Sequence, residues 1–155
     1  MSRSFITVSI TTLLFVLPSW LAAEPNLNSA NLPGAQSGTT AQITFAGTDL
    51  GPNPTLVASF AISSQQSLAG SNNKQAIIEF TTANESPGIH WVRIVSDKGI
   101  TNPIAFALDS LSQTAFSDSI KTTPAAVYGN LAGGAILKTS FSGKQGTALV
   151  IDLEG

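Results

Sequence analysis

The sequence predicts an all-β protein: an antiparallel β-sandwich followed by a second β module that is only begun. Short apolar runs alternate with a period of two, and clusters of Gly, Pro, Asn and Ser separate these runs. Beyond residue 23 no segment shows the 3.6-residue period of a helix. Together these features favour sheets packed face to face.

The first 23 residues have the pattern of a secretory signal peptide, which we expect to be helical. Arg3 precedes an apolar stretch over residues 5–17, Pro18 interrupts it, and Ala23 offers a small residue for cleavage. A retained N-terminal anchor is the alternative, but the run is shorter than the ~20 apolar residues of a spanning helix. We therefore expect an exported protein, in the periplasm, at the cell surface or outside the cell.

Composition excludes some classes of binding partner and some kinds of chemistry. The 155 residues carry a formal net charge of −2, and the chain beyond residue 23 contains six basic and nine acidic side chains. This weak acidic balance argues against nucleic acid, and against an anionic membrane surface once the signal is cleaved. The absence of cysteine excludes disulfides, thiolate metal sites and cysteine nucleophiles.

The predicted elements follow in order along the chain. Residues 24–39 are rich in Pro, Asn, Ser and Gly and form an entry segment with little structure of its own. The Ser- and Gln-rich residues 63–73 are predicted to be a loop. Strands are expected at residues 40–46, 55–62 and 75–81, and a β-hairpin at 87–109 turns at 96–99.

Alternation along these strands sorts their side chains by face. A one-residue slip would turn a strand inside out, so the inward set is well specified. The predicted core comprises Ile43, Phe45, Leu56, Phe60, Ile78, Phe80, Val92, Ile94, Ile104, Phe106 and Leu108.

The opposite face of the first hairpin strand carries Ile89, Trp91 and Val95 around Arg93. These side chains are too apolar for an ordinary solvent face, so we expect something to cover them. The four residues form the candidate interaction surface, on which Trp91 could anchor a protein or stack on a sugar ring.

The tail follows a predicted linker over residues 110–124. Three strands are expected at about 125–131, 136–141 and 147–153, and two or three strands need a second layer to bury an apolar face. Either that face packs against the Ile89, Trp91 and Val95 side of the hairpin, or it requires further sequence; we favour the second. Its apolar set is Val127, Leu131, Leu137, Phe141, Leu149, Ile151 and Leu153.

Residues 38–51, Pro87-Gly88-Ile89 before the hairpin and Phe106 near its end carry a family resemblance. The stretch from about 25 to 109 resembles the IPT/TIG family of immunoglobulin-like domains, with His90 where that family usually has an aromatic residue. The resemblance implies an immunoglobulin-like sandwich over residues 40–109.

The tail carries a second resemblance. Residues 125–131, Phe141 and residues 146–154 are similar to the opening strands of bacterial pre-peptidase C-terminal (PPC) domains, jelly-roll-like modules found beside secreted enzymes. Residues 134–141 lack both aspartates of the corresponding family strand, which puts a calcium-binding role in doubt. The resemblance implies that residues 125–155 begin such a module.

No catalytic constellation is apparent. His90 is the only histidine and shares a face with Val92 and Ile94, so we expect it to be largely buried and without a chemical role. There is no G-x-S-x-G elbow, and zinc would need more histidines or a cysteine. Asp152 and Glu154 share a predicted strand face, which we interpret as solvated. We expect no catalytic, cofactor-binding or metal-binding residue and no cofactor.

These observations favour a non-catalytic, exported module that acts as a spacer, docking or adhesion unit of a larger secreted bacterial protein. Its partners would be other domains of that protein, or a protein or glycan at the cell surface. The alternative is the N-terminal accessory part of a secreted hydrolase, a protease above all, whose catalytic domain lies outside this sequence. A carbohydrate-binding module using Trp91 is the weaker alternative.

Overall fold

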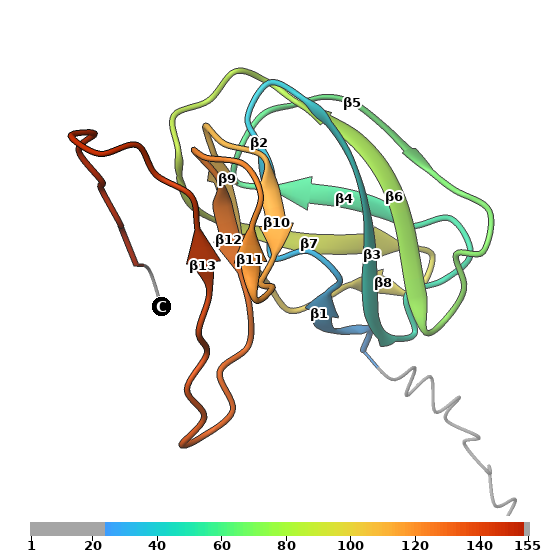
Figure 1. The fold of residues 1–155 in the computed structure, drawn as a ribbon. Helices are drawn as coiled ribbons and strands as arrows, with labels where there is room; N and C mark the ends of the chain where they lie inside the picture. Colours follow the sequence, from blue (N-terminus) through green and yellow to red (C-terminus); the bar gives the residue numbers. More distant parts are fainter. Residues whose placement is uncertain (1–23, 154–155) are drawn as a thin grey trace, which may run out of the picture.

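The computed structural model describes residues 24–153, and these contain strands, turns and irregular segments but no helix (Figure 1). The predicted signal peptide, residues 1–23, lies outside the described residues. The described part therefore includes no helix that could cross a membrane. The strands are β1 (Asn26–Ala30), β2 (Gly34–Gln36), β3 (Thr40–Thr48), β4 (Thr55–Ala58), β5 (Ile62–Ser67), β6 (Gln75–Thr82), β7 (Gly88–Ser96), β8 (Gly99–Ile100), β9 (Ile104–Asp109), β10 (Gln113–Ala115), β11 (Ser119–Ile120), β12 (Ala126–Tyr128) and β13 (Ser140–Phe141).

Two sheets pack face to face, so the predicted β-sandwich is confirmed. One sheet has the order β1-β3-β6-β5, and the other has the order β2-β9-β7-β4 with β8 beside β7. All pairs in these sheets are antiparallel except β2 and β9, which are parallel. The predicted antiparallel pairing of the strands within residues 40–109 is confirmed. The parallel strand β2 precedes that range, because the chain crosses from β1 to the other sheet and enters it beside its last strand, β9.

Residues 24–39 contribute two strands, so the prediction of little structure there is wrong. Leu27 of β1 and Ala35 of β2 are buried in the core, each from a short strand at a sheet edge. Edge strands pair on one side and bury few side chains. The polar composition of this segment therefore concealed its pairing.

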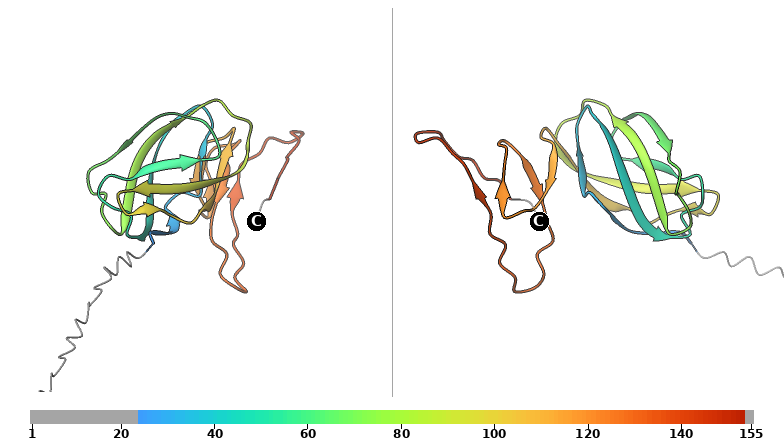
Figure 2. Two further views of the ribbon diagram at one scale, coloured as in Figure 1. Left: turned by 180° about the vertical axis from the view of Figure 1, so that it is seen from behind. Right: turned by 45° about the vertical axis from the view of Figure 1, so that its right-hand side comes forward.

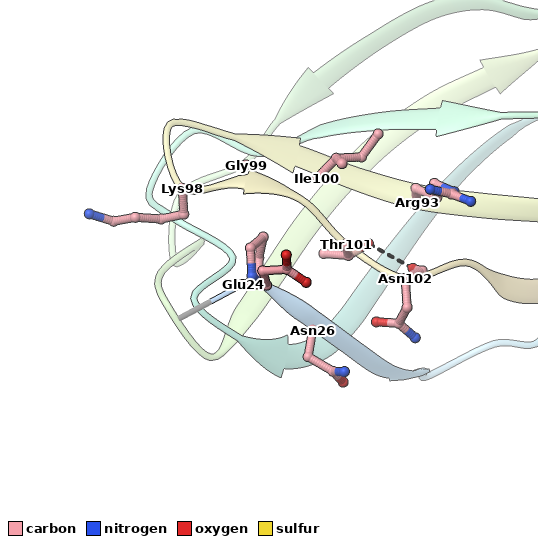
Figure 3. Close-up of a pocket in the computed structure, with 9 residues that line it drawn as sticks. Glu24, Asn26, Arg93, Lys98, Gly99, Ile100, Thr101 and Asn102 are labelled. Atoms are coloured by element: carbon pink, nitrogen blue, oxygen red, sulfur yellow. Dashed lines mark hydrogen bonds between the residues drawn. The ribbon is translucent and has the colours of Figure 1, made fainter. Parts of the chain in front are cut away.

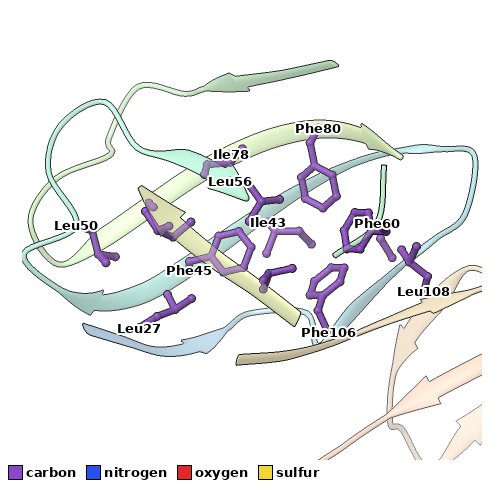
Figure 4. Close-up of a cluster of buried hydrophobic side chains, with 14 residues drawn as sticks. Leu27, Ile43, Phe45, Leu50, Leu56, Phe60, Ile78, Phe80, Phe106 and Leu108 are labelled. Carbon is purple, nitrogen blue, oxygen red and sulfur yellow. The ribbon is translucent and has the colours of Figure 1, made fainter. Parts of the chain in front are cut away.

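The core lies between the two sheets (Figure 4). All the predicted inward side chains are buried except Ile104, which is half-buried and packs against the others. Phe60 lies 6.3 Å from Phe80 and 6.0 Å from Phe106 between ring centroids, and so joins the two layers at one end. Leu27, Ala35 and Leu50 also belong to the core and were not predicted.

β5 replaces part of the predicted loop over residues 63–73. β4 ends at Ala58 instead of continuing to residue 62, and after three residues the chain joins the other sheet as β5. Most side chains of β5 are exposed, and the strand pairs with β6 on one side. An exposed edge strand has no apolar alternation, so the sequence pattern predicted a loop.

Two carboxamides complete the hydrogen bonding of edge strands. Gln65 Oε1 accepts from the Leu56 N–H at 2.8 Å, and Gln65 Nε2 donates to the Leu56 carbonyl at 2.9 Å. Asn102 does the same for Leu27, with distances of 2.7 and 2.9 Å. Each amide therefore takes the place of a neighbouring strand at one open side of the sandwich.

The tail beyond Asp109 pairs differently from the prediction. β10 pairs with β12 and β11 with β13, both in parallel, so the predicted linker over residues 110–124 contains two short strands. The strand expected at 147–153 is irregular, and those at 125–131 and 136–141 are reduced to β12 and β13. The two-stranded pieces bury too little apolar surface to sustain longer ladders.

The tail lies at one side of the two-sheet body (Figure 2). Residues 131–153 are exposed, including the apolar Leu149, Ile151 and Leu153. A small hollow of about 200 Å³ separates it from the sandwich between Pro33 and Tyr128. The tail is therefore attached to the sandwich without contributing to its core.

Candidate functional site

The most distinctive surface of the described residues is the outer face of the sheet that contains β7. Alternation along β7 buries Val92 and Ile94, so the side chains between them must point to the other side. Ile89 and Trp91 are each 57% exposed, Arg93 is exposed and Val95 is half-buried. The structure thus brings the four predicted interaction residues together on one strand.

Neighbouring strands extend this surface. Ala105 of β9 lies opposite Trp91, Val57 of β4 lies opposite Arg93, and Ile100 of β8 lies opposite Val95. All three added side chains are exposed. We call the seven residues the outer face: Val57, Ile89, Trp91, Arg93, Val95, Ile100 and Ala105.

Alternation with the predicted inward Leu56 puts Val57 on the outward side of its strand, but it does not connect Val57 with Trp91. That connection depends on the register between β4 and β7, which no local pattern specifies. Ile100 lies directly after the hairpin turn, where alternation gives no information. The cross-strand pair of Trp91 and Ala105 could have been found by aligning the two hairpin strands.

The backbone beneath Trp91 is held from both sides. The Ser59 N–H donates to the Trp91 carbonyl at 2.9 Å, and the Trp91 N–H donates to Ser59 Oγ at 3.0 Å. β9 pairs along the other side of the strand. Trp91 is therefore presented by a rigid element, which reduces the entropy lost when a surface side chain is ordered on binding.

The expected cover over this face is not present in the described chain. Ile89 and Trp91 keep more than half of their surface exposed, and the tail lies to one side of the sheet. The alternative in which the tail packs against Ile89, Trp91 and Val95 is therefore wrong for residues 110–153. The outer face is accessible to a partner.

Charge on and around this face is sparse. Arg93 is the cation at its centre, and within residues 24–153 the one ion pair joins Lys98 to Asp97 at 3.8 Å. Asp109, at the end of β9, occupies the same side of the sheet as Ala105, because its position alternates with buried Leu108. Its carboxylate accepts from the Leu111 N–H at 2.9 Å.

A shallow hollow of about 490 Å³ adjoins the outer face at Arg93 and Ile100 (Figure 3). Glu24 and Asn102 also line it, whereas the side chain of Lys98 extends away from the other lining residues. Neither Arg93 nor Lys98 lies within 4 Å of the Glu24 carboxylate. The hollow widens the accessible surface at this end of the sheet.

His90 is half-buried, so the prediction that it is largely buried is wrong, although its assigned face is correct. Its Nδ1 lies 3.4 Å from Ser59 Oγ, and its ring meets Phe60 edge-on with centroids 5.4 Å apart. The ring lies where the core ends, so one side packs and the other meets solvent. Ser59 Oγ already accepts from the Trp91 N–H, which makes it a structural partner of β7.

The two acids near the end of the chain, Asp152 and Glu154, were expected on a solvated strand face. Asp152 is exposed, and Glu154 lies outside the described residues. Among residues 24–153, no group of three His, Asp or Glu side chains is close enough to hold a metal ion. The outer face therefore remains the main candidate site.

No protein-family model matches the chain, and no curated protein matches it. Its function must therefore be inferred from the outer face and from the sandwich that holds this face rigid.

Proposed function

We propose that the chain is a non-catalytic, exported β-sandwich module that acts as a docking or spacer unit of a larger secreted protein. The observation that carries this proposal is the outer face, where Ile89, Trp91, Val57 and Ile100 expose apolar surface on a rigid sheet. Contiguous exposed apolar patches are typical of interaction sites, and tryptophan is prominent among residues that dominate binding energy. Export rests on the signal-peptide pattern of residues 1–23.

We propose further that the sandwich is immunoglobulin-like, in keeping with the resemblance to IPT/TIG domains. The strand order β1-β3-β6-β5 corresponds to strands A, B, E and D of that fold, and β9-β7-β4 corresponds to G, F and C. The parallel β2 would then be a second part of strand A that joins the other sheet. In this assignment the outer face lies on the sheet of strands C, F and G.

The exposed apolar side chains of the tail support membership of a larger assembly. Leu137, Phe141 and Leu149 are each more than 40% exposed, although each would be buried in a finished β module. A PPC-like module and a role beside a secreted hydrolase remain proposals that agree with this observation. A glycan partner is less favoured, because the neighbours of Trp91 are mostly aliphatic and offer few hydrogen-bonding groups to sugar hydroxyls.

Hydroxyl-radical footprinting of Trp91 tests the docking role. The protein secreted from the complete reading frame is compared with residues 24–155 alone, both at low concentration. We expect Trp91 and Ile89 to be oxidised more slowly in the secreted protein, while half-buried Ile77, on the outer side of the other sheet, serves as the internal reference. Equal oxidation of Trp91 in both would contradict docking within the larger protein.

A further inference from the structure

We propose that the outer face binds the outer face of a second copy of this chain, forming a two-fold symmetric dimer. This inference rests on the docking role proposed above and names the partner of the same surface: the same module in a second molecule of the larger protein, which the rest of that assembly would hold close enough to cover Trp91 even at low concentration. It follows from the chemistry around Trp91, from the placement of two opposite charges and from the size of the face.

The surroundings of Trp91 favour a protein partner. Val57 and Ile89, 46% and 57% exposed, lie diagonally across from Trp91 and two residues from it along β7, and Ile100, 52% exposed, extends the apolar surface beyond Arg93. An aromatic side chain ringed by aliphatic groups is the typical centre of a protein interface. A protein surface of similar composition would bury all of these groups at once.

The charges indicate which protein surface fits. Arg93 lies two residues beyond Trp91 along β7, and in the β7–β9 register Gly88 is opposite Leu108, so Asp109 lies level with residue 87. Along the strand direction, Arg93 therefore lies three residues to one side of residue 90, and Asp109 lies the same distance to the other side. A two-fold axis that crosses the strands at that level brings Arg93 of each copy to the level of Asp109 of the other.

The same operation pairs the apolar side chains. It places Trp91 of one copy at the level of Ile89 of the other, and every such contact occurs twice because the interface is isologous. Asp109 has acceptor capacity left for an arginine, because a carboxylate offers about four lone-pair positions and the Leu111 N–H and the Ser110 hydroxyl, both on Oδ1, occupy two. Trp91 thus meets Ile89 of the other copy, and each charge lies level with its opposite.

The face is accessible and of limited size. Seen from behind, β4, β7 and β8 lie in front with the tail at one side (left view of Figure 2). The nine residues of β7 span about 30 Å, and two strand spacings add about 10 Å of width. Even with side-chain relief this is below the ~800 Å² per partner of a standard interface, so the dimer should be weak and concentration-dependent.

Trp91 itself reports on the interface, because it is the only tryptophan in residues 24–155. This segment contains every strand of both sheets and is the form to be measured. We expect its fluorescence maximum to shift to shorter wavelength as concentration rises from micromolar to millimolar, in step with dimer formation in sedimentation equilibrium. A monomer at all concentrations, or a dimer without a fluorescence shift, would overturn the proposal.

Substitutions then test the register. Trp91→Ala should weaken dimerisation by at least about thirtyfold, as expected for a central tryptophan. Arg93→Asp and Asp109→Arg should each weaken it, whereas the double substitution R93D/D109R should return it to within about threefold of the unaltered chain. Lys74→Asp is the matched control, because it makes the same charge change at an exposed position in the turn before β6, away from the outer face.

Asp109→Arg removes the acceptor for Leu111 and could unfold the end of β9, so circular dichroism and thermal unfolding accompany each variant. Should it fail to fold, Arg93→Gln and Asp109→Asn replace the pair, since asparagine keeps an acceptor oxygen. We then expect R93Q/D109N to weaken dimerisation no more than either single change. Additive losses, or no loss from R93Q, would overturn the proposed register, while protection of Trp91 in the secreted protein would still support docking.

Discussion

At the scale of single residues, the sandwich depends on two side-chain amides. Leu56 and Leu27 are almost fully buried, yet their backbone groups lie at sheet edges where no further strand pairs with them. Gln65 and Asn102 each satisfy one N–H and one carbonyl there. They also occupy edges that would otherwise be open to pairing with another chain.

Replacing Gln65 with alanine should destabilise the sandwich by about 1–2 kcal/mol. Two hydrogen bonds are lost, each with a net value of about 0.5–1.5 kcal/mol, but Gln65 is itself exposed, so water can replace part of them. Chemical denaturation followed by circular dichroism measures the change. Gln66→Ala is the control, since the side chain of Gln66 is exposed and bonds the side chain of Glu79 only. Equal losses from both would contradict the role of Gln65.

Replacing Asn102 with aspartate keeps an acceptor for the Leu27 N–H but removes the donor to the Leu27 carbonyl. We expect a loss of about 1–2 kcal/mol at pH 7, because an ionised oxygen would then face a carbonyl oxygen. The repulsion raises the pKa of the new carboxyl in the folded state above its unfolded value of about 3.9, so the deficit should shrink as pH falls from neutral through the raised pKa and should be largely gone at about pH 4. Asn73→Asp, at an exposed position, should show neither effect in the same unfolding measurements.

Residue-level alternation predicted the core well, because a strand with one buried face allows one inward set. It could not reveal Gln65 or Asn102, whose importance comes from partners nine and 75 residues away in the sequence. His90 shows the same limit. Its face follows from alternation, but its half-burial depends on where the two layers end.

At the scale of elements, the close contact of β1 with β3 depends on Gly47. A Cβ atom at Gly47 would overlap the Asn26 backbone oxygen and touch Leu50, so any larger residue would push the edge strand away. β1 supplies Leu27 to the core, and displacing the strand would therefore open one side of the sandwich. The glycine is needed here for space.

Gly47→Ala should accordingly destabilise the sandwich by about 1–3 kcal/mol, the usual range for overpacking. Hydrogen exchange should locate the loss in β1, with faster exchange of the Leu27 amide than in the unaltered chain. Gly133→Ala is the matched control, since nothing lies within 4 Å of the added methyl group. An unchanged Leu27 exchange rate in G47A would show that β1 tolerates the larger side chain.

Elements that bury an apolar face were predictable, whereas edge elements were not. β3, β6, β7 and β9 alternate clearly and were assigned nearly to their observed limits. β1, β2 and β5 have polar sequences because they pair on one side and bury little. The candidate surface was also predicted from alternation, because Trp91 is a large apolar side chain on a face that alternation assigns to solvent.

At the scale of the whole molecule, the sandwich and the tail differ in burial. The buried hydrophobic core lies between Leu27 and Leu108, whereas residues 131–153 are exposed. A large share of the exposed apolar side chains is therefore concentrated in a segment that adds nothing to the core. The sandwich should consequently fold cooperatively whether or not the tail is attached.

Ending the chain at Leu111 tests this difference. Residues 24–111 keep all strands of both sheets and the Asp109–Leu111 hydrogen bond, so the thermal midpoint should change by less than about 5 °C. Binding of the dye ANS should fall strongly, because the tail's apolar side chains are removed. Trp91→Ala in the shortened chain should then reduce the residual ANS binding, which we assign to the outer face. Two results would instead place residues 112–155 within the cooperative unit of the sandwich. One is equal, low dye binding by the two forms, and the other is a thermal midpoint more than about 10 °C lower without the tail.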